Sequence, residues 1–248
     1  MNWILDLPTV YPLLPGSVQV WSVEFGLLGE QLGQFERVLS PDERQRANRY
    51  RQKQDRVRYI VVRGVLRMIL GGYLGLSPSE FEFSYSERGK PQLKTHSTGI
   101  EFNVSHSEDK GLLAIALNRR VGIDVEYIRS IEVLQLAKRF FRESEYLFLR
   151  GLQQKEQLKA FFQLWTAKEA YVKATGEGLA GLETVEISLS ELESAENLTV
   201  DCRGFQWGLQ SLDLGENYCA AIAVEGKDYN ICQIDCYGNR QQGTGNRQ

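Results

Sequence analysis

The sequence contains few of the residues that build soft-metal sites or disulfide frameworks. Among its 248 residues are two histidines, His96 and His106, so a histidine-rich metal centre is excluded. All four cysteines lie in the last fifth of the chain and none forms a CxxC pair, although Cys232 and Cys236 are spaced like half a metal site. Because partner ligands are missing, we interpret all four as free thiols in a reducing compartment.

Long apolar runs are also absent. No stretch reaches the roughly 20 residues that a membrane helix needs, and the first residues, MNWILDLPTVYPLLPG, lack the basic region and cleavage site of a signal peptide. The formal net charge of -3 gives no global field that would attract nucleic acid or an anionic membrane. We therefore expect a cytoplasmic protein with no membrane partner.

Hydrophobic periodicity predicts a mixed α+β fold. Residues 17–25 alternate like a half-buried strand, and a long helical pattern begins after Ser40, with Pro41 at its first position and Glu43 closing a capping box. We expect this helix to end or weaken at Gly71-Gly72. The remaining elements are predicted as strands over 81–87, 102–104, 111–117 and 121–126, helices over about 131–150 and 155–174, and mainly strands after that.

Two apolar segments resemble each other weakly. They are GLLAIAL at 111–117 and YCAAIAV at 218–224, each after a polar turn, and they suggest two similar halves. The polar, low-complexity end of the chain, GNRQQGTGNRQ from Gly238, predicts a disordered tail.

Asp124 and Glu126 form the first candidate for chemistry. On a strand, their spacing places both carboxylates on one face while Ile123 and Val125 point into the core. Two neighbouring carboxylates repel each other unless a cation lies between them, and oxygen ligands without histidine favour Mg²⁺. The alternative is a solvated face of an edge strand.

The second candidate is the segment LWTAKEAYVKATGEGL at 164–179. On a helix, Trp165, Glu169 and Lys173 share one face at successive steps of four residues. The aromatic residue indicates that this face approaches the core, where an unsupported charged pair is costly. Glu169 could then be a third metal ligand and Lys173 could reach a diphosphate; the alternative is a routine surface ion pair.

The third candidate is the segment FNVSHS at 102–107. His106 directly follows a predicted strand, and Ser105 beside it adds a hydroxyl donor, so both could contact a phosphate or pyrophosphate. The alternative is a lone histidine in a turn. No nearby acid, serine and histidine arrangement supports a hydrolase triad.

A cationic stretch runs from residue 41 to 67. Nine basic residues face only three acidic ones there, in a chain that is net negative, and arginine is suited to binding phosphate. Few aromatic residues are interleaved, which argues against single-stranded nucleic acid, and a solvated helix face is the other alternative. The basic residues are Arg44, Arg46, Arg49, Arg51, Lys53, Arg56, Arg58, Arg63 and Arg67.

The order and spacing of these motifs resemble the 4'-phosphopantetheinyl transferase superfamily, specifically the surfactin-synthetase-activating (Sfp) type. The similarity runs from about Val18 to Val224: a cationic helix, the turn Arg88-Gly89-Lys90-Pro91, NVSHS, GIDVE, AKRFFRESEY at 137–146, and WTAKEAYVKATGEGL. It implies two α+β halves related by a pseudo-twofold axis, over 1–118 and 119–236, with coenzyme A between them and the polar tail over 237–248.

The resemblance also implies roles for individual residues. Asp124, Glu126 and Glu169 would hold Mg²⁺ with the coenzyme A pyrophosphate, and Glu169 would also act as the base or orient the water that deprotonates the acceptor serine. The remaining implied contacts are Lys173 and His106 to the diphosphate, Lys90, Pro91 and Ser105 to the nucleotide, and Arg46 and Arg58 to the 3'-phosphate. Glu43 departs from the pattern, since some relatives carry a basic residue there; affinity for that phosphate is then lower, or Arg44 substitutes.

The implied reaction is transfer of 4'-phosphopantetheine from coenzyme A to a serine of an apo acyl, polyketide or peptidyl carrier protein, with release of adenosine 3',5'-bisphosphate. The implied enzyme is a monomer without a nucleic-acid partner, and fatty-acid, polyketide and peptide-synthetase pathways all use such carriers. Two alternatives remain: a Mg²⁺-dependent nucleotide pyrophosphate hydrolase, and a non-enzymatic nucleic-acid-binding adaptor that uses the cationic helix.

Overall fold

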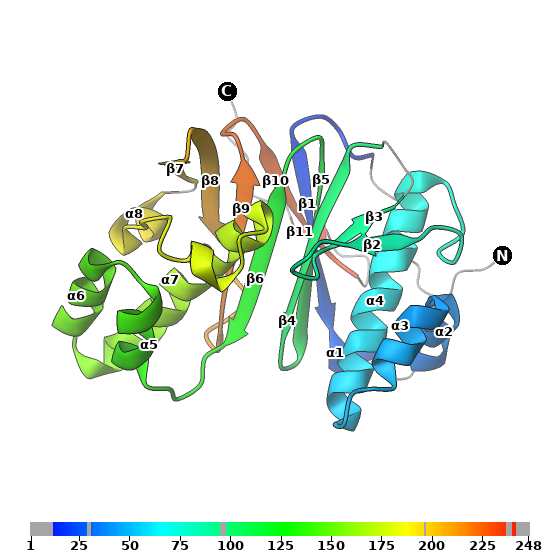
Figure 1. The fold of residues 1–248 in the computed structure, drawn as a ribbon, viewed down its shortest axis with the longest axis horizontal. Helices are drawn as coiled ribbons and strands as arrows, with labels where there is room; N and C mark the ends of the chain where they lie inside the picture. Colours follow the sequence, from blue (N-terminus) through cyan, green and yellow to red (C-terminus); the bar gives the residue numbers. More distant parts are fainter. Residues whose placement is uncertain (1–11, 29–30, 95–97, 196, 237–239, 242–248) are drawn as a thin grey trace.

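Two β-sheets stand next to each other in the centre of the computed structural model, with the long helices on their outer sides (Figure 1). The structure describes residues 12–28, 31–94, 98–195, 197–236 and 240–241. One sheet has the strand order β11-β10-β1-β5-β4 and the other the order β6-β9-β8-β7, beside a separate hairpin β2-β3. The strands are β1 (Ser17–Glu24), β2 (Phe83–Tyr85), β3 (Pro91–Leu93), β4 (Ile100–Ser107), β5 (Lys110–Leu117), β6 (Val121–Tyr127), β7 (Leu198–Cys202), β8 (Phe205–Ser211), β9 (Tyr218–Glu225), β10 (Asn230–Asp235) and β11 (Arg240–Gln241).

Helices cover each sheet on the side away from the other sheet (Figure 1). The first group is α1 (Phe25–Leu28), α2 (Leu32–Val38), α3 (Pro41–Ala47) and α4 (Lys53–Leu74). The second group is α5 (Val133–Phe140), α6 (Glu143–Gly151), α7 (Gln154–Thr175), the short 3₁₀ helix η2 (Leu179–Gly181) and α8 (Leu189–Ser194). The mixed α+β fold predicted from the sequence is confirmed, and no described helix is long and apolar enough to cross a membrane.

Strand alternation divides the buried residues into three cores. On β5, Leu113 and Ile115 face α4, whereas Leu112, Ala114 and Ala116 face the other sheet. The inward residues of β6 and β9 close this central core, and their opposite faces pack on α7. Each sheet thus has one face on a long helix and one face on the central core, so its strands are apolar on both sides.

The two sheets share a strand order. When strands β10, β11 and β7 are left aside, the earliest strand of each sheet pairs with the latest and the latest pairs with the middle one, in β1-β5-β4 and in β6-β9-β8. A 22-residue helix, α4 or α7, lies in the chain between the earliest and the middle strand of each set. This shared order supports the predicted similarity of two halves. The division at residue 118 and the pseudo-twofold axis stay predictions.

The long cationic helix is broken into two helices in the structure. The capping box at Ser40 begins α3, which ends at Ala47, and α4 starts only at Lys53. The helix continues past Gly71 to Leu74 and ends at Gly75, whose left-handed φ of 65° suits a glycine C-cap. Gly71 instead allows the chain after the helix to pack closely, because a Cβ there would lie 2.8 Å from the carbonyl oxygen of Leu76.

Three other segments differ from the sequence prediction. Residues 131–150 form two helices, α5 and α6, and His106 lies inside β4, not after a strand. Strand β10 lies in the range assigned to the second half, yet it pairs in parallel with β1 of the first sheet. Of the expected tail over 237–248, Arg240–Gln241 pair with β10 and the rest lies outside the described residues.

Candidate active site

The acidic strand and the long helix α7 bring the main candidate residues together. Residues 121, 123 and 125 of β6 point into the central core, so Asp124 and Glu126 point the other way, toward α7. This helix packs tightly on β6 at Gly122, where an added Cβ would lie 2.0 Å from the carbonyl oxygen of Ala170. The close approach places the α7 residues Glu169 and Lys173 within electrostatic reach of the strand carboxylates.

Asp124 is the centre of this group. It is 3% exposed, and its Oδ1 accepts hydrogen bonds from Lys173 Nζ at 2.6 Å and from Ser105 Oγ at 2.8 Å. Lys173 Nζ also lies 2.9 Å from Ser105 Oγ. The second oxygen, Oδ2, is buried and has no hydrogen-bond partner in the described part of the chain. A buried carboxylate oxygen without a partner is costly, so this atom indicates a missing ligand.

The surroundings of the other two carboxyl groups, Glu169 and Glu126, disfavour their negatively charged form. Burial and the neighbouring Asp124 raise the pKa of Glu169 to about 7, against the opposing effect of Lys173. Burial and Asp124 also raise the pKa of Glu126, although Arg129 and Ser107 donate to it at 3.2 Å each. Crowded carboxylates with raised pKa values are what a bound cation would relieve.

The acidic side chains do not form a complete metal-coordination site by themselves. Across the described ranges, no three His, Cys, Asp or Glu side chains converge closely enough to hold a metal ion by themselves. Lys173 also occupies one oxygen of Asp124. The donor set is nevertheless all oxygen, which suits Mg²⁺, and this ion usually completes its shell with phosphate and water instead of protein ligands alone. The residues therefore fit Mg²⁺ as partial ligands.

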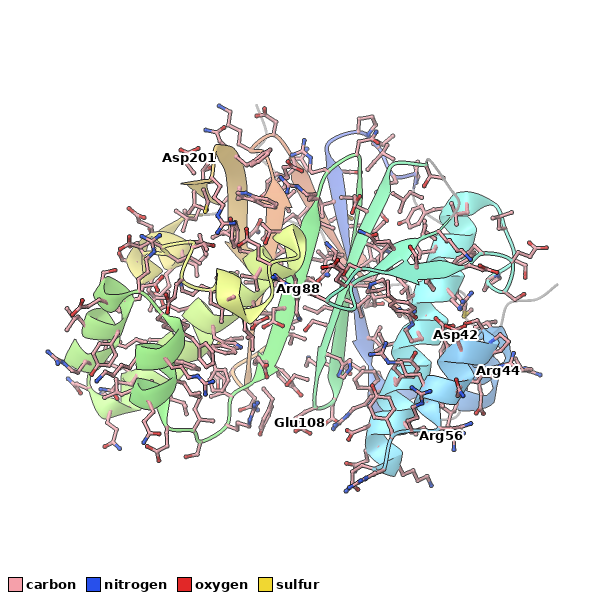
Figure 2. All side chains as sticks on the ribbon, viewed as in Figure 1. Asp42, Arg44, Arg56, Arg88, Glu108 and Asp201 are labelled. Carbon is pink, nitrogen blue, oxygen red and sulfur yellow. The ribbon has the colours of Figure 1, made fainter. Side chains whose placement is uncertain are left out.

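The cationic turn lies where the hairpin β2-β3 meets the end of α7. Lys90 Nζ is 3.3 Å from the carbonyl oxygen of Ala174 and 3.5 Å from that of Val121, and burial lowers the pKa of this lysine. Arg88, labelled in Figure 2, donates to the carbonyl oxygen of Gly176 at 3.1 Å. Pro91 begins β3 and is half-buried. These two cations therefore contact carbonyl groups of β6 and of the end of α7.

A cavity of about 470 Å³ opens beside this turn. It is lined by Lys90 from the hairpin, Glu101 from β4, Arg120 just before β6, and the end of α7. A larger cavity of about 560 Å³ lies between the ends of β1 and β10 and residues 212–215, and none of the candidate residues lines it. The smaller cavity is therefore the one next to the candidate residues.

His106 and Arg58 lie on the α4 side of the same region. Side chains alternate along β4, so His106 points away from Ser105, with its ring edge-on to Phe25 at 6.3 Å between centroids. Partial burial, and the positive charges of Lys173 and Arg58, lower the pKa of His106. Arg58 pairs with Glu108 at 2.8 Å, at the tip of the β4-β5 hairpin (Figure 2).

The remaining cationic residues divide into buried and exposed ones. Arg63 and Arg67 are buried against Glu43, at 2.7 Å and 2.5 Å, so this pair serves the fold and is closed to a phosphate. Arg46 is exposed on α3, with its guanidinium 5.7 Å from the centre of the Tyr59 ring. Arg44 donates to the carbonyl oxygen of Leu39 at 3.0 Å. Arg46 is thus free to turn toward a ligand, whereas Glu43 is a structural residue.

Sequence reasoning missed two polar side chains of β4 in this site. Asn103 and Ser107 lie on the same side of β4 as Ser105, and both contact β6. Polar residues at every second position, 103, 105 and 107, are the signal for such a face. This alternation was missed because the strand was expected to end at Val104.

Comparison with known proteins agrees with this geometry. Residues 120–223 match the family model described as 4'-phosphopantetheinyl transferase superfamily, and residues 28–118 match the model for the N-terminal part of a 4'-phosphopantetheinyl transferase. The chain is 43% identical over 228 residues to 4'-phosphopantetheinyl transferase HetI of a Nostoc species, covering 91% of this chain and 94% of that protein. It is 32% identical over 151 residues to 4'-phosphopantetheinyl transferase Sfp of Bacillus subtilis, covering 61% and 66%. The chain belongs to the 4'-phosphopantetheinyl transferase superfamily.

Proposed function

We propose that this transferase uses Asp124, Glu126 and Glu169 with Mg²⁺ to move the 4'-phosphopantetheine group of coenzyme A to a serine of an apo carrier protein. Members of the superfamily are enzymes of this kind, and this chain is one of them. The single observation that supports the residue assignment is the buried, unpartnered Oδ2 of Asp124, next to two carboxylates with raised pKa values.

The three carboxylates are the proposed protein ligands of Mg²⁺. Bound there together with the coenzyme A diphosphate, the ion would neutralise negative charge on the phosphate oxygens. The protein supplies the surroundings: burial of Asp124 and the hydroxyl of Ser105 fix the orientation of the central ligand. Lys173 contacts Asp124 Oδ1, and this contact supports the proposal that its ammonium group would lie beside the diphosphate.

Glu169 is the proposed base for the acceptor serine. Without a metal ion, burial and Asp124 raise the pKa of Glu169 to about 7. A bound cation would lower this pKa again, and the carboxylate would then accept the serine proton or orient the water that accepts it. Lys173 and His106 would then stabilise the leaving adenosine 3',5'-bisphosphate by charge and hydrogen bonding. Lys90, Pro91 and Ser105 remain the proposed nucleotide contacts, and Arg46 and Arg58 the proposed contacts of the 3'-phosphate.

Intact mass of an apo carrier incubated with coenzyme A and Mg²⁺ tests the assignment. Asp124→Asn keeps the shape of the side chain, so the fold should survive while the carrier gains no phosphopantetheine. Glu24→Gln, on the far end of β1, is the matched control and should leave the mass gain intact. Full transfer by the folded Asp124→Asn variant would contradict the metal assignment.

The same assay separates the alternative activities. Cleavage of coenzyme A without a carrier would favour the pyrophosphate hydrolase. Binding of nucleic acid that weakens steeply with salt and does not change in Asp124→Asn would favour the adaptor. The proposed monomer is tested by light scattering after size-exclusion chromatography, and a panel of acyl, polyketide and peptidyl carriers identifies the acceptor.

A further inference from the structure

Among the strands that the structure describes, none forms a backbone ladder with the outer edge of β6. Strand β6 is the edge strand of the four-stranded sheet, and β4 is the edge strand of the other sheet, so the two strands run next to each other without belonging to one sheet. In an antiparallel pair, every second residue turns its N–H and C=O groups away from the partner strand. Buried edge groups of this kind need other partners.

Side chains of β4 supply the acceptors. The N–H of Ile123 donates to Asn103 Oδ1 at 3.0 Å, and the N–H of Val125 donates to Ser105 Oγ at 3.3 Å. The N–H of Tyr127 donates to Ser107 Oγ at 3.0 Å. The pattern advances by two residues on both strands, so it is a regular ladder made of side chains in place of a backbone ladder. We name Asn103, Ser105 and Ser107 the polar ladder.

Lysines supply the donors at the same edge. The carbonyl oxygen of Val121 accepts from Lys90 Nζ at 3.5 Å, and that of Ile123 accepts from Lys173 Nζ at 3.3 Å. Three N–H groups and two C=O groups on this edge of β6 therefore have side-chain partners, from the hairpin, from β4 and from α7. These contacts join the two sheets at the point where the carboxylates stand.

Each serine of the polar ladder has a second bond, to a carboxylate. Ser105 Oγ donates to Asp124, and Ser107 Oγ donates to Glu126 Oε2 at 3.2 Å. A hydroxyl has one donor and two acceptor sites, so each serine can accept from the backbone N–H of one residue and donate to the side chain before it. Asn103 accepts from the N–H of Ile123, and the residue before Ile123 is Gly122, which has no side chain to orient.

We propose that the polar ladder joins the two halves and that Ser107 is a positioning residue for Glu126. The second part rests on the proposed function, because it matters only if Glu126 binds the metal. The Ser107 hydroxyl donates to the Glu126 carboxylate and accepts from the backbone N–H of Tyr127, so that this carboxylate keeps a fixed position relative to β4.

Hydrogen exchange of single amides in the ligand-free protein tests the ladder without any activity. Ser107→Ala removes the acceptor of the Tyr127 amide, whose exchange should rise roughly tenfold, as expected when a hydrogen bond worth about 1.4 kcal/mol is lost. Asn103→Ala should have the same effect at Ile123 and none at Tyr127. Ser107→Thr keeps a hydroxyl and should restore slow exchange.

Binding of Mn²⁺ in the presence of coenzyme A, followed by electron paramagnetic resonance, tests the positioning role. Ser107→Ala should weaken Mn²⁺ binding roughly tenfold, because effects of this size follow loss of a residue that orients a metal ligand. Asn103 bonds to a backbone N–H and orients no carboxylate, so the Asn103→Ala variant should bind Mn²⁺ like the wild type. Ser107→Thr should recover the affinity, and in turnover assays Ser107→Ala should lower kcat and need more Mg²⁺.

The outcomes separate the two proposals. Unchanged exchange at Tyr127 in Ser107→Ala would overturn the ladder, and faster exchange with wild-type Mn²⁺ affinity would overturn the positioning role. Equal losses of Mn²⁺ affinity in Asn103→Ala and Ser107→Ala would also overturn it, because backbone anchoring alone would then explain both. Transfer by Asp124→Asn would instead refute the proposed function and leave the exchange result standing.

Discussion

Gly122→Ala should damage both stability and turnover, although residue 122 is not among the proposed contacts of the metal or of coenzyme A. Gly122 lies on β6 between the buried strand residues, directly under α7. A Cβ at this position would lie 2.0 Å from the carbonyl oxygen of Ala170 and 2.4 Å from the nitrogen of Ala174. Both atoms belong to the helix backbone, which cannot rotate away as a side chain can.

The size of the effect follows from these distances. An ordinary contact begins near 3.4 Å, so the carbonyl group must retreat by about 1.4 Å from the strand. Overpacking of this kind costs about 1–3 kcal/mol, and we expect the upper end because a whole helix has to move. Glu169 and Lys173 move with α7, and a displacement of about 1 Å at a catalytic group can cost roughly 100-fold in rate.

Two measurements check this prediction. Urea unfolding of Gly122→Ala should give a lower free energy of unfolding, and kcat/KM should fall by about two orders of magnitude at a temperature where the variant is folded. Gly151→Ala is the matched control, because its added Cβ meets nothing within 4 Å and the residue lies in α6. Wild-type stability and turnover in Gly122→Ala would refute the close packing of α7 on β6.

Two further predictions concern buried charge. Glu43→Ala leaves Arg63 and Arg67 buried without their carboxylate, so chemical denaturation should show a loss of about 3–5 kcal/mol, and a loss below 1 kcal/mol would contradict the buried ion pairs. For Glu169, a pKa of about 7 in the folded chain against ~4.3 in the unfolded chain favours the folded state fully below pH ~4.3, and this contribution is lost as the pH rises through 7. Metal-free wild-type protein should therefore lose stability between about pH 4.3 and 7 relative to Glu169→Gln, and parallel pH profiles of the two proteins would show that the carboxyl group is not perturbed.

Local spacing was sufficient to predict which side chains share a face of one strand or one helix, whereas the resemblance to the family implied that the two faces come together. A period of two on a strand places Asp124 and Glu126 on one face, and a period of four on a helix places Glu169 and Lys173 on another. The structure brings Lys173 into contact with Asp124 and places Glu169 within its electrostatic field. These periods belong to the backbone, so they need no knowledge of the tertiary structure.

Pairings between distant segments could not be read in the same way. Strand β10 pairs with β1 across more than two hundred residues, and Glu43 pairs with arginines on another helix. The cationic stretch shows the consequence: its charge surplus indicates phosphate binding, but Arg63 and Arg67 are used to neutralise one buried carboxylate. The composition of a segment gives the number of its charged residues, but the packing of the fold determines which of them are accessible to a ligand.

The segment WTAKEAYVK shows how one motif serves both the fold and the proposed chemistry. Lys168 and Glu169 are neighbours on α7, so they point in different directions. Lys168 is fully buried, 2.8 Å from Glu145 of α6, and it donates to the carbonyl oxygens of Leu182 and Val185. It fixes α7 to its own half on the side away from β6, while Glu169 and Lys173 face the strand carboxylates. A buried ion pair holds α7 on one side and Gly122 packs against it on the other, so a shift of the helix would cost both contacts. These contacts therefore keep Glu169 and Lys173 beside the strand carboxylates that we propose as ligands of the cation.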